Sequence, residues 1–124
     1  MTLQELYGKI DGDYEQATKV LRVEKLIDKH IRRFPTGGVV TAVIEAGKTM
    51  DPTALFESAH AMKGVCANLG LMKLYEAASA LSEEYRPGNP RTMTDEQVKE
   101  KISYIEAQFE KTAAGIKEYE QSVQ

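Results

Sequence analysis

Apolar residues recur at intervals of three and four along nearly the whole chain, and no segment alternates with a period of two for more than a few residues. Intervals of three and four place side chains on one face of an α-helix, whereas a half-buried strand alternates every second residue. The last segment shows this spacing most clearly, and only Thr112 interrupts its apolar line of Val98, Ile102, Ile105, Phe109, Ile116, Tyr119 and Val123. The pattern therefore predicts an all-α fold.

Turn-forming residues divide the first half of the chain. A short amphipathic segment over 3–10 ends at Asp11-Gly12-Asp13, where Asp13 is placed to cap the next helix. That helical region extends to Phe34, with a possible break at Leu21-Arg22-Val23, and its expected core residues are Val20, Val23, Ile27, Ile31 and Phe34. After the turn at Pro35-Thr36-Gly37-Gly38, a helix beginning at Thr36 or Gly37 is expected to bury Val39, Val40, Val43 and Ile44 before Gly47.

Three longer helices follow, over about 52–69, 71–86 and 94–122. Asp51 caps the first of them, and Gly70 is expected to end it in a left-handed conformation. The second is expected to bury Leu74, Ala78, Leu81 and Tyr85. Thr94 and Gln97 have the spacing of a capping box at the start of the third. Short connections make successive helices antiparallel neighbours, so residues 1–124 are expected to form one domain, an antiparallel up-and-down four-helix bundle with one or two short N-terminal helices.

Composition excludes several classes of function. A net charge of -3 and a pI near 5.4 do not provide the concentrated positive charge that nucleic-acid binding requires. No run of about 18 apolar residues and no basic N-terminal segment before an apolar one is present, so neither membrane insertion nor export is expected. The single cysteine, Cys66, lies among apolar positions and is expected to be a buried structural thiol in a reducing cytoplasm.

The helix over 52–69 has a polar face opposite its apolar stripe. At about 100° per residue, His60 lies about 140° from Leu55, and the stripe consists of Leu55, Ala59, Met62, Cys66 and Leu69. Lys63, Gly64 and Ala67 lie beside the histidine. An imidazole in water is partly unprotonated near neutral pH, so a ring nitrogen of His60 could accept a phosphoryl group. Lys63 would offset part of the phosphoryl charge, and Gly64 and Ala67 would leave room for a partner.

The segment His60-Ala61-Met62-Lys63-Gly64, followed by Gly70, resembles the HxxKG…G signature of histidine phosphotransfer (HPt) domains. The flanking residues 56–59 and 67–71, together with the bundle expected for the whole chain, are similar to stand-alone bacterial members. Ala61-Met62 stands where many members have a hydroxyl residue and leucine, a difference that bears on partner choice more than on transfer.

The resemblance implies that His60 carries a phosphoryl group between aspartates of response-regulator receiver domains, or takes one from a hybrid sensor histidine kinase, in a multistep phosphorelay. In that scheme Mg2+ and the acidic pocket belong to the receiver domain, and this chain needs no cofactor. No glycine-rich nucleotide loop is present, so a phosphocarrier is expected rather than an enzyme that binds ATP. A carrier needs its histidine face free, which favours a monomer.

Other interpretations of these residues remain open. Phe56, about 40° from His60 on the helix, either packs on an N-terminal helix or joins Gly64 and Ala67 in an apolar docking patch. An adaptor with the HPt fold could bind a receiver domain or a kinase without carrying phosphate. A metal-binding bundle would need two Glu-x-x-His pairs, and only Glu57 and His60 have that spacing, so no metal site is expected. His30 is interpreted as a positive residue in the last turn of a helix.

Overall fold

The computed structural model describes residues 1–122, and over that range the regular structure is entirely helical. Its elements are α1 (Leu3–Lys9), α2 (Tyr14–Leu21), α3 (Glu24–Arg33), the 3-10 turn η1 (Phe34–Thr36), α4 (Val39–Thr49), α5 (Pro52–Leu69), α6 (Met72–Tyr85) and α7 (Asp95–Ser122). The prediction of an all-α fold is confirmed, while Val123 lies outside the described residues. Within residues 1–122, none of the helices has the length and apolar character needed to cross a membrane.

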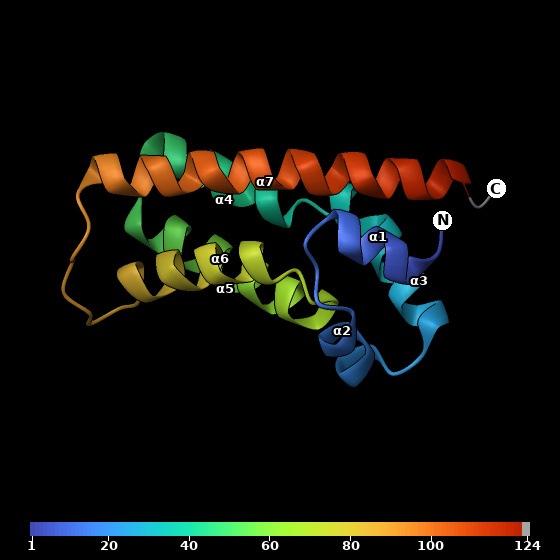
Figure 1. The fold of residues 1–124 in the computed structure, drawn as a ribbon. Helices are drawn as coiled ribbons and strands as arrows, with labels where there is room; N and C mark the ends of the chain where they lie inside the picture. The colour runs from blue at the N-terminus through green and yellow to red at the C-terminus, as the bar shows by residue number, and fades with distance from the viewer. Residues whose placement is uncertain (123–124) are drawn as a thin grey trace.

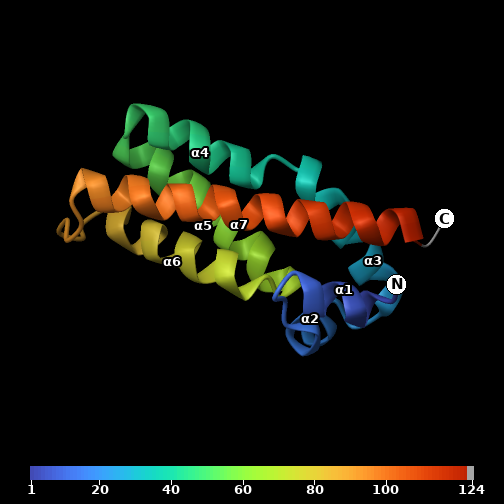
Figure 2. The same cartoon turned by 45° about the horizontal axis from the view of Figure 1, so that its top comes forward.

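The four longest helices pack around a common core. Helix α5 contacts α4 and α6, and α7 contacts the same two helices. Figure 1 shows α7 extending along the length of the molecule, with α6 running beside it in the opposite direction, and Figure 2 shows α4 on the other side of α7. Helices α1 to α3 gather at the end of the molecule where α5 passes into α6 (Figure 1). Helix α5 therefore packs against α2 at this end, in addition to its contacts with α4 and α6.

The N-terminal part contains three short helices rather than one or two. Arg22 has a positive φ of 67° and the next residue is extended, so the region predicted as helical from Asp13 to Phe34 is divided into α2 and α3. Residues on opposite sides of this break no longer share one helical face. The predicted burial of Val20 and Val23 is therefore wrong, because these side chains are 41% and 52% exposed, whereas the predicted burial of Ile27, Ile31 and Phe34 is confirmed.

Local capping explains where α5 begins and ends. The Asp51 side chain accepts a hydrogen bond from the backbone N–H of Ala54 at 3.0 Å, and Gly70 ends the helix with φ 69°. The Gly70 carbonyl accepts a hydrogen bond of 2.7 Å from the N–H of Asp13, and a Cβ at Gly70 would lie 2.2 Å from the Asp13 carbonyl oxygen. Both the conformation and the close approach therefore require glycine at this turn.

Most of the expected apolar faces form the core. On α4, however, Val40 and Val43 are buried as predicted, whereas Val39 and Ile44 are only half-buried. Every predicted apolar residue of α7 within the described range is buried except Phe109, which is half-buried and packs edge-to-face against Phe34 with ring centroids 5.8 Å apart. Helix α4 was expected to begin at Thr36 or Gly37 and to end before Gly47, but it spans Val39–Thr49. Gly47 therefore lies inside α4 rather than at its end. A Cβ at this position would come within 2.6 Å of the Ile102 side chain on α7, so the glycine allows α4 and α7 to approach closely.

Reciprocal hydrogen bonds confirm the capping box that begins α7. The N–H of Thr94 donates to the Gln97 side chain at 2.9 Å, and the N–H of Gln97 donates to the Thr94 hydroxyl at 3.1 Å. Together they satisfy two donors that a helix N-terminus would otherwise leave unpaired.

Candidate functional site

His60 lies in the middle of α5 with its side chain exposed, as the helical period predicts. Its imidazole stacks on the ring of Phe56, one turn earlier, with ring centroids 5.6 Å apart and an angle of 24° between the ring planes. Stacking covers a face of the imidazole, whereas both nitrogens lie on the edge of the ring. The ring nitrogens of this exposed side chain are therefore not covered by Phe56.

Lys63 follows one turn after His60 and is half-buried at the side of α5 that faces α6. None of the ion pairs among residues 1–122 includes Lys63. The carboxyl of Glu83 on α6 has a lowered pKa, mainly because Arg86 donates a hydrogen bond to it. The positive charge of Lys63 lies close enough to Glu83 to lower this pKa further. The Lys63 ammonium thus remains available to a charged group bound at His60.

Open space surrounds the next position on this face. A Cβ placed on Gly64 would meet no heavy atom of the described structure within 4 Å, so tight packing against a neighbouring helix does not explain this glycine. Ala67, one turn further on, is half-buried, and its carbonyl accepts a hydrogen bond of 3.3 Å from the side chain of Gln16 on α2. The face is therefore open at Gly64 and bordered by α2 beyond Ala67.

Phe56 contacts both the core and His60, and its part in a docking patch stays a prediction. It is half-buried against the core and also stacks on His60. The guanidinium of Arg86, the residue that ends α6, lies 5.8 Å from the centre of the Phe56 ring. Sequence reasoning missed Glu83 and Arg86 because a helical wheel of α5 carries no information on which α6 residues lie beside it. The only available indication was Arg86-Pro87-Gly88, which marks the end of a helix.

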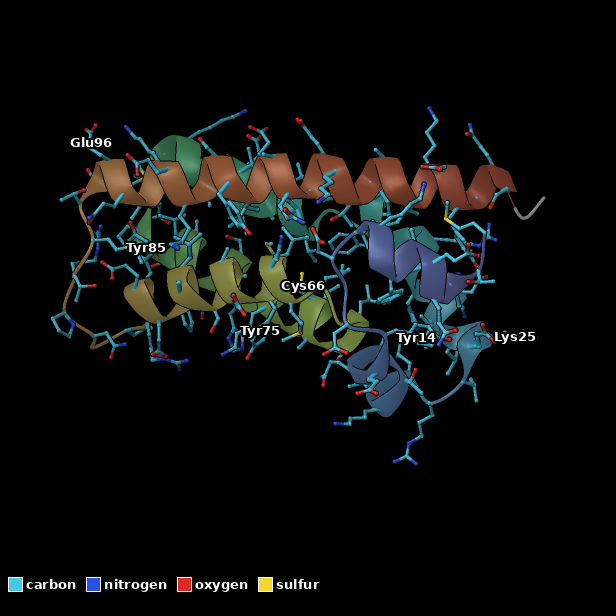
Figure 3. All side chains as sticks on the ribbon, viewed as in Figure 1. Tyr14, Lys25, Cys66, Tyr75, Tyr85 and Glu96 are labelled. Carbon is cyan, nitrogen blue, oxygen red and sulfur yellow. The ribbon has the colours of Figure 1, made fainter. Side chains whose placement is uncertain are left out.

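The structure also places the residues assigned structural roles. Cys66 is buried inside the molecule (Figure 3), and burial raises the pKa of its thiol to about 12, which makes it unreactive at neutral pH. His30 occupies the last turn of α3, as predicted. In the part of the chain that the structure describes, no cluster of three histidine, cysteine or acidic side chains is arranged to hold a metal ion.

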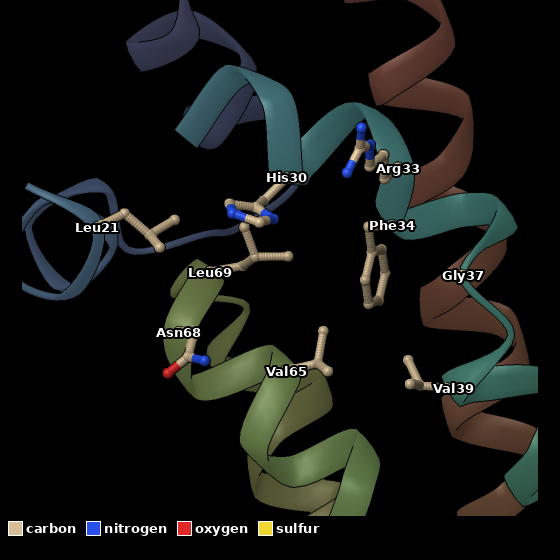
Figure 4. Close-up of a pocket in the computed structure, with 9 residues that line it drawn as sticks. All are labelled: Leu21, His30, Arg33, Phe34, Gly37, Val39, Val65, Asn68 and Leu69. Carbon is tan, nitrogen blue, oxygen red and sulfur yellow. The ribbon is translucent and has the colours of Figure 1, made fainter. Parts of the chain in front are cut away.

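An open pocket of about 270 Å³ lies between α3, α4 and α5, away from the His60 face. Figure 4 shows Phe34 and Val39 on one side of it and Val65 of α5 on the other, with His30 near Leu69. Val65 is about 140° from His60 around the helix axis, and His60 does not line the pocket. The pocket and the candidate nucleophile therefore occupy different sides of α5.

Comparison with known proteins adds independent evidence to this geometry. The family model described as Hpt domain matches residues 15–113, which include α2 except Tyr14, all of α3 to α6 and most of α7. Comparisons with curated proteins and with solved structures found no match. Hpt domains are phosphocarrier modules of histidine phosphotransfer signalling in two-component phosphorelays. Because the match spans well over half of the sequence and includes the exposed histidine face, the chain belongs to the Hpt domain family.

Proposed function

We propose that the protein is the histidine phosphocarrier of a multistep phosphorelay and that His60 is its phosphoacceptor. The observation that carries this proposal is an exposed imidazole in the middle of α5, next to the open space at Gly64. Transfer between two proteins requires donor and acceptor atoms within about 3.5 Å. Only a histidine on an unobstructed face can approach a partner's active site so closely.

The chemistry is a reversible exchange of bonds at phosphorus. An unprotonated ring nitrogen of His60 attacks the phosphorus of an aspartyl phosphate on a receiver domain, a nitrogen–phosphorus bond forms, and the bond from phosphorus to the aspartate oxygen breaks. The aspartate leaves as a carboxylate. The reverse reaction passes the phosphoryl group to the aspartate of a second receiver domain.

Lys63 would stabilise the phosphorylated state. A phosphoryl group brings a charge of about -1.5 to -2, and an ammonium one helical turn away offsets part of it through Coulomb attraction or a hydrogen bond. Phe56, Gly64 and Ala67 would contact the partner around the histidine. The receiver domain would supply Mg2+ and the acidic pocket, so this chain would need no cofactor or ATP site of its own.

In this role α4 to α7 would act as an antiparallel up-and-down four-helix bundle that keeps α5 rigid. The expected partners are a response-regulator receiver domain, a hybrid sensor histidine kinase, or both, and neither nucleic acid nor a membrane. We expect a cytoplasmic monomer, because self-association over α5 would cover His60. The net charge of -3 agrees with a protein partner rather than with nucleic acid.

The chain offers a matched control for testing the acceptor, because it contains only two histidines. The wild type, His60→Gln and His30→Gln would be incubated with phosphoramidate, and separately with a phosphorylated receiver domain and Mg2+. We expect an acid-labile, base-stable adduct on the wild type and on His30→Gln, and none on His60→Gln. Labelling of His60→Gln would contradict the assignment of the acceptor.

The same assay separates a carrier from an adaptor that only binds. An adaptor would bind a receiver domain equally well with His60 or glutamine and would accept no phosphoryl group from either donor. A wild type that binds the receiver domain but is never labelled would therefore overturn the carrier function.

A further inference from the structure

The stacked pair of Phe56 and His60 has a geometric consequence for transfer. The two residues are four positions apart on α5, which brings their side chains together on one helical face. Their ring centroids are 5.6 Å apart and their planes differ by only 24°. The Phe56 ring thus lies nearly parallel to the imidazole and is offset along one of its faces.

The Phe56 ring is itself held in place from α6. It is half-buried against the core, and the Arg86 guanidinium lies 5.8 Å from its centre. Arg86 is anchored in turn, because its Nε donates to the two carboxylate oxygens of Glu83 at 2.8 and 3.4 Å. The ring therefore has supporting contacts on two helices and cannot follow the imidazole freely.

A fixed ring beside a histidine limits the orientations that the histidine can adopt. A histidine inside a helix has about two accessible staggered positions for χ1, because the third clashes with the preceding turn, and about two broad ones for χ2. Orientations that would drive the imidazole into Phe56 are removed, while the nitrogens on the ring edge stay uncovered. The contact thus restricts the nucleophile without blocking it.

We propose that Phe56 is a positioning residue for phosphotransfer, which holds the imidazole of His60 in a restricted orientation, with Arg86 supporting the Phe56 ring. This role rests on the function proposed above for His60. Restricting the imidazole lowers the entropic cost of the transfer step, because part of the orientation needed for in-line attack is in place before the donor arrives.

The main test replaces the flat ring while keeping apolar volume. Phe56→Leu removes the stacking surface and Phe56→Tyr retains it, whereas Tyr104→Leu is a control at an aromatic residue of α7 that is 47% exposed. The rate of labelling by phosphoramidate would be measured, together with the NMR ring-current shifts of the His60 ring protons. We expect Phe56→Leu to react about two to four times more slowly, as the number of accessible orientations rises, and to lose the ring-current shift. Phe56→Tyr should keep the ring-current shift and react faster than Phe56→Leu, and Tyr104→Leu should react at the wild-type rate.

A second variant tests the support of the ring and does not alter the core. Arg86→Gln should slow labelling in the same direction as Phe56→Leu but less, and should reduce the His60 ring-current shift. Lys48→Gln is its matched control, because Lys48 and Glu45 form an exposed pair with the same i,i+3 spacing, at 2.9 Å. If Phe56→Leu fails to fold, Arg86→Gln and Phe56→Tyr still decide the outcome.

Several results would overturn the positioning role. One such result is a Phe56→Leu variant that loses the ring-current shift yet reacts with phosphoramidate at the wild-type rate, because orientation then does not limit the reaction. If only transfer from a receiver domain were slowed, Phe56 would be a docking contact instead. A wild type that accepts no phosphoryl group would refute the carrier function separately, and the ring-current shifts of the variants would then alone decide whether Phe56 restricts His60.

Discussion

Glu84 provides a quantitative test of how the end of the bundle is held. Its side chain is only 3% exposed, although it carries a charge. One carboxylate oxygen accepts hydrogen bonds from the backbone N–H groups of Thr92 and Met93, both at 2.8 Å, and from Nε of Arg91 at 3.0 Å. The other oxygen accepts one from the Thr92 hydroxyl at 2.6 Å. This single side chain therefore fixes the loop that leads from α6 to α7.

The hydrogen bonds outweigh the cost of burying the charge. Burial alone would raise the pKa of Glu84, but hydrogen bonds from the Thr92 side chain, from the backbone of Met93 and Thr92, and from Arg91 lower it from its ordinary 4.5 to about 2. This lowering corresponds to about 3 kcal/mol of folding free energy at neutral pH. Solvent screening around Arg91, which is 42% exposed, reduces the expected contribution to about 2 kcal/mol.

The sign of the pH dependence follows from the direction of the change. Because the pKa of Glu84 is lower in the folded than in the unfolded chain, its contribution is complete above about pH 5 and is lost as the pH falls from about 4.5 toward 2. Glu84→Gln removes the charge, so we expect it to lower the free energy of unfolding by about 2 kcal/mol at pH 7. At pH 3 the difference from the wild type should be less than half as large.

Urea unfolding followed by circular dichroism at pH 7 and pH 3 measures both quantities. Glu83→Gln is the matched control, since Glu83 is the preceding residue but is 58% exposed, and its ion pair is with an exposed arginine. Its effect should stay within about 0.5 kcal/mol. The reasoning would be refuted if Glu84→Gln were as stable as the wild type at pH 7, or if its destabilisation were the same at both pH values.

Three further predictions concern α5. Gly64→Ala should stabilise the fold by about 1 kcal/mol, because alanine is the better helix former and its Cβ meets open space. The same variant should slow phosphoryl transfer from a receiver domain without slowing labelling by phosphoramidate. Faster transfer from the receiver domain would contradict a close approach of the partner at Gly64. Gly70→Ala should destabilise the fold by about 2–4 kcal/mol in urea unfolding, since its Cβ would meet the Asp13 carbonyl; near-wild-type stability would show that this turn adapts. The Cys66 thiol, with its pKa raised to about 12 by burial, should not react with Ellman's reagent at pH 8 until urea unfolds the protein, so rapid reaction of the native protein would contradict its burial.

Helix caps, helix ends and the exposed face of α5 could be predicted from the sequence, because each depends on residues that are close together in the chain. The cap at Asp51, the left-handed stop at Gly70 and the capping box at Thr94 each involve residues within a few positions of one another. The exposure of His60 follows from the helical period in the same way, because 100° per residue separates it from the apolar stripe of its own helix. These predictions needed no knowledge of the neighbouring helices.

The wrong burial predictions arose where one helical period was assumed to continue through the break between α2 and α3. Val20 and Val23 fit the apolar spacing of a continuous helix, but the positive φ of Arg22 turns the chain between them. The sequence indicated a possible break at Leu21-Arg22-Val23, but a positive φ is uncommon for a non-glycine residue, and apolar spacing alone did not show that the break would expose both valines. Glu84 is a similar case, because a charged residue on α6 is expected in solvent unless distant donors are known to surround it.

Residue order thus decided the helix faces, the helix ends and the exposed position of His60 on α5, because each follows from local geometry and hydrogen bonds within a few residues. Packing decided which side chains of other helices lie near that imidazole. Arg86 and Glu83 flank Phe56 and Lys63 only because α6 folds back along α5, and Glu84 is buried only because the loop before α7 closes over it. Contacts of this kind depend on how whole helices are placed against one another, which no spacing within a single helix specifies.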